Sequence, residues 1–250
     1  WAGGSGALGA GAAPRPAELD QMVAARVAGR PLEHIVGWAE FADLRIAVAP
    51  GVFVPRQRTR WLAMLALGAA RAALARRPAG PVTAVELCCG AGAVAAVLAD
   101  RLGDQLLRLA AADIDPAAVR CARANLPGSA RVGCGDLYSA VPIELRGAVD
   151  VLIANAPYVP TAAIALMPPE ARLHEPRIAL DGGPDGLAVQ RRVIAEAPRW
   201  LGPGGVLLIE TSQRQAPSTA AAMSAVGLRT WVRRSEDHDG TVVAGRRGRG

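Results

Sequence analysis

A small-residue turn, Val85-Glu86-Leu87-Cys88-Cys89-Gly90-Ala91-Gly92-Ala93, lies between an apolar stretch and an alanine-rich stretch. Glycine at two of these positions lets the backbone pass close to a ligand without an intervening side chain. In open α/β sheets, such strand-to-helix turns lie at the edge where ligands bind. A tight turn also needs glycine, so the pair by itself leaves both interpretations open. As a binding loop, it would place these residues against a cofactor: Glu86, Cys88, Cys89, Gly90, Ala91 and Gly92.

Two acids extend this candidate site. Asp113 follows the loop by about twenty residues, where a carboxylate can accept both ribose hydroxyls of a nucleoside. Asp136 could accept from an adenine amine while Leu137 packs on the ring, although a surface turn is the alternative. Asp115 precedes a proline and is better explained as a helix N-cap. Ala95 stands where dinucleotide sites usually carry a third glycine, so a nucleoside cofactor other than NAD is favoured.

Alternating strands and helices must position these groups. Five mainly apolar runs are predicted to be strands: Val82–Leu87, Leu109–Asp113, Arg131–Cys134, Val149–Ala154 and Gly205–Glu210. Helices are predicted at Arg60–Arg76, Val94–Arg101, Pro116–Ala124 and Gln190–Trp200. This alternation is typical of an α/β fold with a mostly parallel sheet. The last two strands, Leu228–Arg233 and Thr241–Gly245, have no long helix between them and should pair antiparallel.

The N-terminal part of the chain is expected to be a small appendage. Residues 1–18 are rich in Gly, Ala and Pro and indicate a flexible segment. A short helix at Pro16–Ala28 and a β-hairpin of Gly37–Phe41 with Leu44–Ala49 fill most of residues 19–52. Residues 53–250 are then the main domain.

Composition narrows the class of protein. No apolar run reaches the roughly 20 residues that span a bilayer, and the sequence shows no export signal, so a cytoplasmic protein without membrane contact is expected. The 28 basic residues are all Arg and are spread along the chain, which gives a net charge of +6 but no basic cluster typical of nucleic-acid binding. Cysteine and histidine spacing does not fit zinc, so no metal is expected.

The fourth predicted strand runs into Asn155-Ala156-Pro157-Tyr158. With this segment the chain resembles the HemK/PrmC-type protein-(glutamine-N(5)) methyltransferases, which carry N-P-P-Y at the end of that strand. The resemblance covers roughly Val27 to Gly245 and includes GRPLEHIVGWAEFADLRIAVAPGVFVPR and HEPRIALDGGPDGL. It implies a Rossmann-like class I methyltransferase fold with seven strands and the methyl donor S-adenosyl-L-methionine, released as S-adenosyl-L-homocysteine. It also implies a protein glutamine as acceptor, such as that of a peptide chain release factor.

The resemblance assigns the acceptor to the four residues of this segment. A carboxamide nitrogen is a poor nucleophile because its lone pair is delocalised, so it must be oriented in line with the sulfonium methyl group. The Asn155 oxygen, beside the donor, can accept one N–H, and the carbonyl of Ala156 can accept the other. Pro157 and Tyr158 complete the predicted catalytic and substrate-binding set, with the tyrosine as a flat wall. Phe41 matches an aromatic position near the family's glutamine pocket, or equally a core residue of the hairpin.

The sequence departs from the family pattern in several places. Ala156 replaces the first proline but keeps the carbonyl, and Cys88 replaces the first glycine of the loop. Arg58 and Arg60 stand where the family carries acids, which is unfavourable near a cationic cofactor unless they point outward or meet an acid such as Glu175. The family's N-terminal helical domain, which helps to hold the release factor, is short here.

Three alternatives to glutamine methylation remain. Enzymes with similar N/D-P-P-Y motifs methylate an exocyclic amine of adenine or cytosine in RNA or DNA, on a flipped or single-stranded base. A small-molecule or peptide amide is a further acceptor class. A protein that binds the cofactor without catalysis is the last, since a fold does not fix a function.

Overall fold

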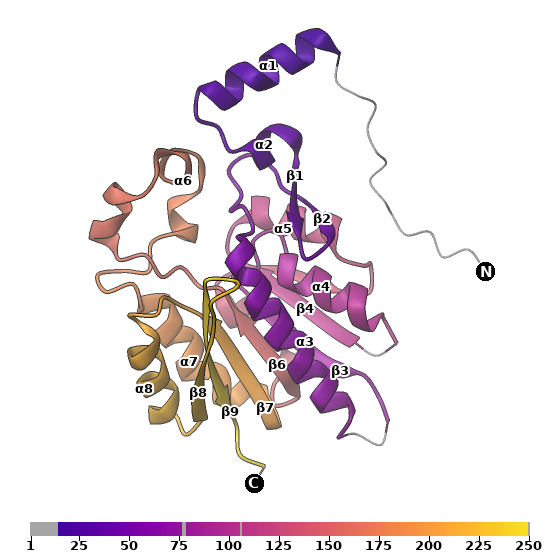
Figure 1. Cartoon of the computed structure of the whole chain (residues 1–250). Helices are drawn as coiled ribbons and strands as arrows, with labels where there is room; N and C mark the ends of the chain where they lie inside the picture. Colours follow the sequence, from indigo (N-terminus) through magenta and orange to yellow (C-terminus); the bar gives the residue numbers. More distant parts are fainter. Residues whose placement is uncertain (1–14, 77–78, 106, 250) are drawn as a thin grey trace, which may run out of the picture.

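Seven strands form the central sheet of the computed structural model, which describes residues 15–76, 79–105 and 107–249 (Figure 1). Their order across the sheet is β5-β4-β3-β6-β7-β9-β8. The bounds are β3 (Val82–Leu87), β4 (Leu107–Asp113), β5 (Arg131–Cys134), β6 (Val149–Ala154), β7 (Leu201–Glu210), β8 (Arg229–Ser235) and β9 (Gly240–Arg246). The strands β3 to β7 are parallel, whereas β9 pairs antiparallel with both β7 and β8, so the predicted topology is confirmed.

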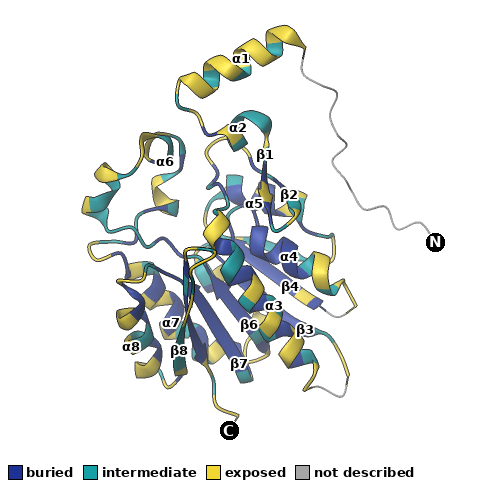
Figure 2. Cartoon of the chain, in the orientation of Figure 1, coloured by how far each residue is buried: buried dark blue, intermediate teal, exposed yellow. Residues whose placement is uncertain are grey.

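Helices cover both faces of this sheet (Figure 1). One face packs against α3 (Arg60–Leu74), α4 (Ala93–Leu102) and α5 (Pro116–Asn125). The other face packs against α7 (Ala188–Trp200) and α8 (Ala216–Ala225). Successive residues of β3 point to opposite layers, with Ala84 in the first core and Val85 in the second. Figure 2 shows the result, a buried sheet between helices whose outer faces are exposed. Burial on both faces explains why the parallel strands are nearly continuous apolar runs.

The N-terminal appendage consists of α1 (Pro16–Val27), α2 (Leu32–Val36) and the hairpin of β1 (Trp38–Phe41) and β2 (Leu44–Ala47). The hairpin turn places Ala42 and Asp43 at φ values of 50° and 66°, as a two-residue turn of the I′ kind requires. The Asn125 side chain bonds to the backbone of Ala47 in β2 and of Ala91 in the glycine turn, so it ties the hairpin to that turn. Residues 1–14 of the predicted flexible segment lie outside the described residues.

Two features differ from the sequence-based expectations. Strand β7 begins at Leu201, before the predicted Gly205, and its pairing with β6 is interrupted between Leu201 and Val206, where Gly204 has a φ of 76°. Helix α8 was not predicted, because the apolar residues of Ala216–Ala225 do not recur at helical spacing. The remaining elements are short, namely α6 (Pro169–His174) and the 3-10 helices η1 (Gln57–Thr59), η2 (Leu137–Ala140), η3 (Ile143–Leu145), η4 (Thr161–Leu166) and η5 (Arg177–Ala179). No helix in the described part of the chain has the length and apolar character needed to cross a bilayer.

Candidate active site

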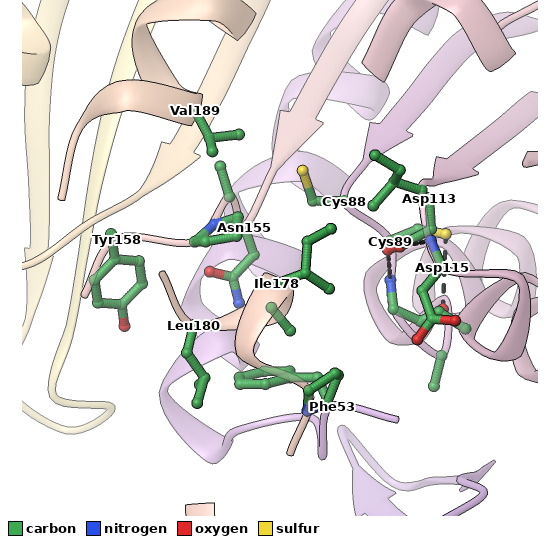
Figure 3. A pocket seen from close by; sticks show the side chains of 18 of the residues that line it. Phe53, Cys88, Cys89, Asp113, Asp115, Asn155, Tyr158, Ile178, Leu180 and Val189 are labelled. Carbon is green, nitrogen blue, oxygen red and sulfur yellow. Dashed lines mark hydrogen bonds between the residues drawn. The ribbon is translucent and has the colours of Figure 1, made fainter. Parts of the chain in front are cut away.

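The carboxyl ends of the parallel strands meet at one edge of the sheet and bring the predicted site residues together. The strand order reverses between β3 and β6, and ligands of open α/β sheets bind at such a switch point. Leu87 pairs with Ala154 across these strands, so the chain leaves the sheet side by side at Cys88 and Asn155. Neighbouring strands lie about 4.8 Å apart. Both segments line the same pocket, shown in Figure 3.

The turn after β3 has the backbone of a ligand-binding loop. Cys88 and Gly92 adopt left-handed conformations with φ values of 53° and 75°. A Cβ at Gly92 would lie 3.2 Å from the Cβ of Ala122, so the close approach of α5 also requires glycine there. At Gly90 an added Cβ would meet nothing within 4 Å, which leaves open space on the loop. The loop therefore presents backbone to the pocket.

The Glu86 carboxylate lies beneath this loop and accepts from the backbone N–H of Ala95 at 2.8 Å. Only 3% of the residue is exposed, and burial raises its pKa to about 8, although backbone hydrogen bonds from Ala95 and Val94 act in the opposite direction. Burial also raises the pKa values of the Cys88 and Cys89 thiols, so both stay protonated and unreactive at neutral pH.

Asp113, at the end of β4, holds the loop from the other side. Its Oδ2 accepts from the N–H of Gly90 at 2.8 Å, and its Oδ1 accepts from the N–H of Asp115 at 2.9 Å. Burial raises the pKa of Asp113. Each oxygen keeps a further lone pair, which a hydroxyl of a ligand can use. Asp115 caps α5 by accepting from Ala117 at 2.8 Å, which confirms the N-cap interpretation.

Asp136 and Leu137 line the same end of the pocket, after β5. Arg192 of α7 forms an ion pair with Asp136 at 2.5 Å, a partner that sequence reasoning missed. The sequence carries no local signal for this contact, because 56 residues separate the pair.

The predicted acceptor segment, Asn155 to Tyr158, lines the opposite end of the pocket, the acceptor end. The Asn155 Nδ2 donates to the Oγ1 of Thr59 at 3.3 Å, and the Tyr158 hydroxyl donates to Glu210 at 3.5 Å. Burial and the nearby carboxylate raise the pKa of Tyr158 to about 12, so it remains neutral. Ala156 is fully buried at this end of the pocket. Thr59 and Glu210 are further side chains of this site that sequence reasoning did not single out.

The glycine-rich motif of residues 181–187 supports this segment from behind. Gly182 donates to the carbonyl of Val159 at 2.9 Å. The Gln215 Nε2 bonds to the carbonyls of Tyr158 at 2.9 Å and Asp185 at 3.0 Å. A Cβ at Gly186, whose φ is 76°, would overlap the Tyr158 carbonyl oxygen. The motif thus fixes the backbone of the acceptor segment.

Each arginine that lines the acceptor end is paired with an acid. Arg56 meets Glu175 at 2.6 Å, and Arg58 meets Glu210 at 3.5 Å while its guanidinium lies 5.8 Å from the centre of the Tyr158 ring. The sequence suggested Glu175 as a partner for an unfavourable arginine, but it is Arg56 that it binds.

The two phenylalanines have opposite roles. Phe41, the last residue of β1, is fully buried in the core and is not a lining residue of the pocket, which fits the core alternative. Phe53 lines the pocket instead, and the Arg56 guanidinium lies 4.9 Å from the centre of its ring. The remaining acceptor walls are apolar and come from Met167, Pro176, Ile178, Ala179 and Leu180. Among the described residues, no group of three or more His, Cys, Asp or Glu is placed to hold a metal ion.

The known proteins to which this chain is similar are methyltransferases. The family described as "Methyltransferase small domain" matches residues 72–182. The release factor glutamine methyltransferase of Mycolicibacterium smegmatis is 38% identical over 90% of this chain and 76% of its own length. That of Streptomyces coelicolor is 40% identical over 78% of this chain and 67% of its own. The 4-amino-L-phenylalanine/4-methylamino-L-phenylalanine methyltransferase of Streptomyces pristinaespiralis is 37% identical over 86% of this chain and 73% of its own.

Solved structures share the fold. A methyltransferase from Pyrococcus furiosus superposes with a TM-score of 0.58 at 16% identity, over 92% of this chain and 99% of that one. The ribosomal protein L11 methylase from Lactobacillus delbrueckii subsp. bulgaricus gives a TM-score of 0.54 at 17% identity, over 81% of this chain and 85% of that one. The predicted class I methyltransferase fold is therefore confirmed.

Proposed function

The chain belongs to the release factor glutamine methyltransferase family, and we propose that it transfers a methyl group from S-adenosyl-L-methionine to a glutamine side-chain nitrogen of a release factor. The observation that carries this proposal is the pairing of Leu87 with Ala154. It sets the turn after β3 and the segment from Asn155 to Tyr158 side by side around one pocket.

The residues of the β3, β4 and β5 ends fit the nucleoside part of this cofactor. Asp113 keeps free lone pairs for ribose hydroxyls, and Leu137 offers an apolar contact for adenine beside Asp136. Open space at Gly90 leaves room against the loop backbone. When bound, the cofactor supplies an electrophilic methyl group on a sulfonium. Glu86, Cys88 and Cys89 line the same pocket, and their raised pKa values keep them protonated and therefore weak as competing nucleophiles.

The acceptor end fits a neutral planar amide. The Asn155 oxygen and the carbonyl of Ala156 are the two acceptors for its N–H groups, and both residues line the pocket. The apolar walls around Phe53 and Tyr158 suit a carboxamide held flat. Since the arginines that line this end are paired with acids, the site offers a phosphate backbone no unpaired cation there, which favours a protein over a nucleic acid. In this proposal residues 53–250 are the catalytic domain, and the reaction takes place in the cytoplasm, where release factors act.

Methyl transfer to a recombinant release factor tests the proposal. The chain is incubated with labelled cofactor, a release factor and, separately, total RNA and DNA. Mass spectrometry should find one added methyl group on the glutamine of the release factor, and Asn155→Ala should lower its rate by at least about 100-fold. Label only in nucleic acid, or a release factor that stays unmodified, would overturn it.

A small aromatic amine is the second candidate acceptor. The relative from Streptomyces pristinaespiralis, named for 4-amino-L-phenylalanine, is as similar to this chain as the release factor enzymes are. An arylamine nitrogen is also planar with a delocalised lone pair, and the walls of Phe53, Ile178 and Leu180 suit a ring. Adding 4-amino-L-phenylalanine to the same assay decides between the two acceptors.

A further inference from the structure

Glu210 is the last residue of β7 and lies beside the acceptor end of the pocket, but it takes no direct part in the proposed methyl transfer. The residue is 1% exposed and does not itself line the pocket. Its carboxylate faces three side chains that do line it, those of Arg58, Thr59 and Tyr158. A buried carboxylate surrounded by lining residues is placed to orient them rather than to touch a substrate.

The hydrogen-bond capacities of these groups define one arrangement. An ionised carboxylate only accepts, and the buried Oε2 of Glu210 has no hydrogen-bond partner, so the neighbouring Thr59 hydroxyl, which lowers the pKa of Glu210, is the donor that can turn toward it. The Thr59 oxygen can then only accept, and its other partner is the Nδ2 of Asn155 at 3.3 Å. With Nδ2 held by Thr59, the Oδ1 of Asn155 is the atom left for the pocket. The reversed amide would set two acceptors of hydrogen bonds, Oδ1 and Oγ1, against each other.

The Arg58 guanidinium favours the ionised form of this carboxylate. Burial raises the pKa of Glu210, whereas the Thr59 hydroxyl and the Arg58 guanidinium act in the opposite direction. The ion pair joins Nε of Arg58 to Oε1 of Glu210 at 3.5 Å. The same oxygen accepts from the Tyr158 hydroxyl at 3.5 Å, so one carboxylate contacts both the amide chain and the aromatic wall.

We propose that Thr59 and Glu210 are positioning residues that hold the Asn155 carboxamide with its oxygen toward the acceptor nitrogen. This rests on the proposed function, because that function makes the Asn155 oxygen the acceptor of a substrate N–H. A reversed amide would turn its NH₂ toward the substrate's NH₂ and lose the bond that orients the nucleophile. Substitutions at Thr59 and Glu210 should lower kcat and leave cofactor affinity unchanged, because these residues contact the acceptor segment.

The first test compares Thr59→Val, Thr59→Ser and the matched control Thr219→Val. Thr219 is a buried threonine on α8 that donates to Gln190 and does not line the pocket. Thr59→Val should lower kcat about 10- to 100-fold, with affinity for S-adenosyl-L-homocysteine within about twofold of wild type. Thr59→Ser should recover kcat to within about threefold. A kcat for Thr59→Val equal to that of Thr219→Val, or no recovery with Ser, would overturn the proposal.

The second test needs no acceptor, and it is read from the wild-type protein. The chain has two asparagines, Asn125 and Asn155, so loss of a signal in Asn155→Ala assigns the side-chain NH₂ of Asn155 in a nitrogen-15 NMR spectrum. The account expects these protons to exchange with water more slowly than a free amide in the wild-type protein. Exchange at the free-amide rate would overturn it. Since no methyl transfer is measured, this outcome is independent of whether release factors are the substrate.

Discussion

Replacing Glu86 by glutamine should remove a large part of the pH dependence of folding stability. Glu86 is 3% exposed, and burial raises its pKa from the ordinary 4.5 to about 8. The folded protein therefore keeps this proton over a pH range in which the unfolded chain has lost it. The corresponding stability is fully present below pH 4.5 and is lost as the pH rises through about 8. Glutamine has the same shape, can accept from Ala95, and does not titrate.

The magnitude follows from the shift. One pKa unit corresponds to about 1.4 kcal/mol, and most of the shift falls between pH 5 and pH 8. The free energy of unfolding of Glu86→Gln minus that of wild type should therefore increase by about 3 kcal/mol over this range. Taking the difference cancels the other titrating groups, which the two proteins share.

Urea unfolding followed by circular dichroism at several pH values measures this difference in the cofactor-free protein. Glu236→Gln, at an exposed position before β9, is the matched control and should give a difference that does not vary with pH. A difference that stays constant for Glu86→Gln, or that shrinks as the pH rises, would refute the assignment of a buried neutral acid beneath the loop.

Three further outcomes follow from the site. Asp113→Asn should weaken binding of S-adenosyl-L-homocysteine about tenfold by calorimetry, because an amide cannot accept at both positions that the carboxylate uses; unchanged affinity would contradict this. Gly186→Ala should lower the free energy of unfolding, measured by urea unfolding, by at least about 2 kcal/mol, because the new Cβ would overlap the Tyr158 carbonyl at a positive φ. A stability equal to wild type would contradict the proposed support of the acceptor segment by residues 181–187. Phe53→Ala should raise the KM for the acceptor with little change in Tm, because Phe53 lines the pocket. Phe41→Ala should instead lower the free energy of unfolding by about 3 to 5 kcal/mol and leave KM unchanged, because Phe41 is buried in the core. The reverse pattern would assign Phe41 to the acceptor pocket.

The sheet could be predicted because its strands carry a local signal. The boundaries of Val82–Leu87 and Val149–Ala154 agree with the structure residue for residue, since both are apolar runs closed by a turn. The predicted start of β7 at Gly205 was late by four residues, because Leu201 already pairs with Val149 of β6 before the irregularity that separates it from Val206. Residues at the carboxyl ends of strands, including Asp113, could be placed because parallel strands end at the same edge of the sheet.

The acceptor site could be predicted only in part. The segment from Asn155 to Tyr158 follows a strand and was singled out from the sequence as the acceptor segment, and the structure places it in the pocket wall. Thr59 and Glu210 were not, because 96 residues separate Thr59 from Asn155 and 52 separate Tyr158 from Glu210, so only the folded chain brings them together. Phe41 and Phe53 are both aromatic residues of the N-terminal motif, and only burial distinguishes the core residue from the wall.

A crystal structure of the chain with S-adenosyl-L-homocysteine would show whether one pocket holds both the methyl donor and the acceptor. We expect the ribose on Asp113, the adenine beside Leu137, and the sulfur facing the Oδ1 of Asn155 across an open acceptor site. A ligand bound elsewhere, or a sulfur turned away from Asn155, would contradict it.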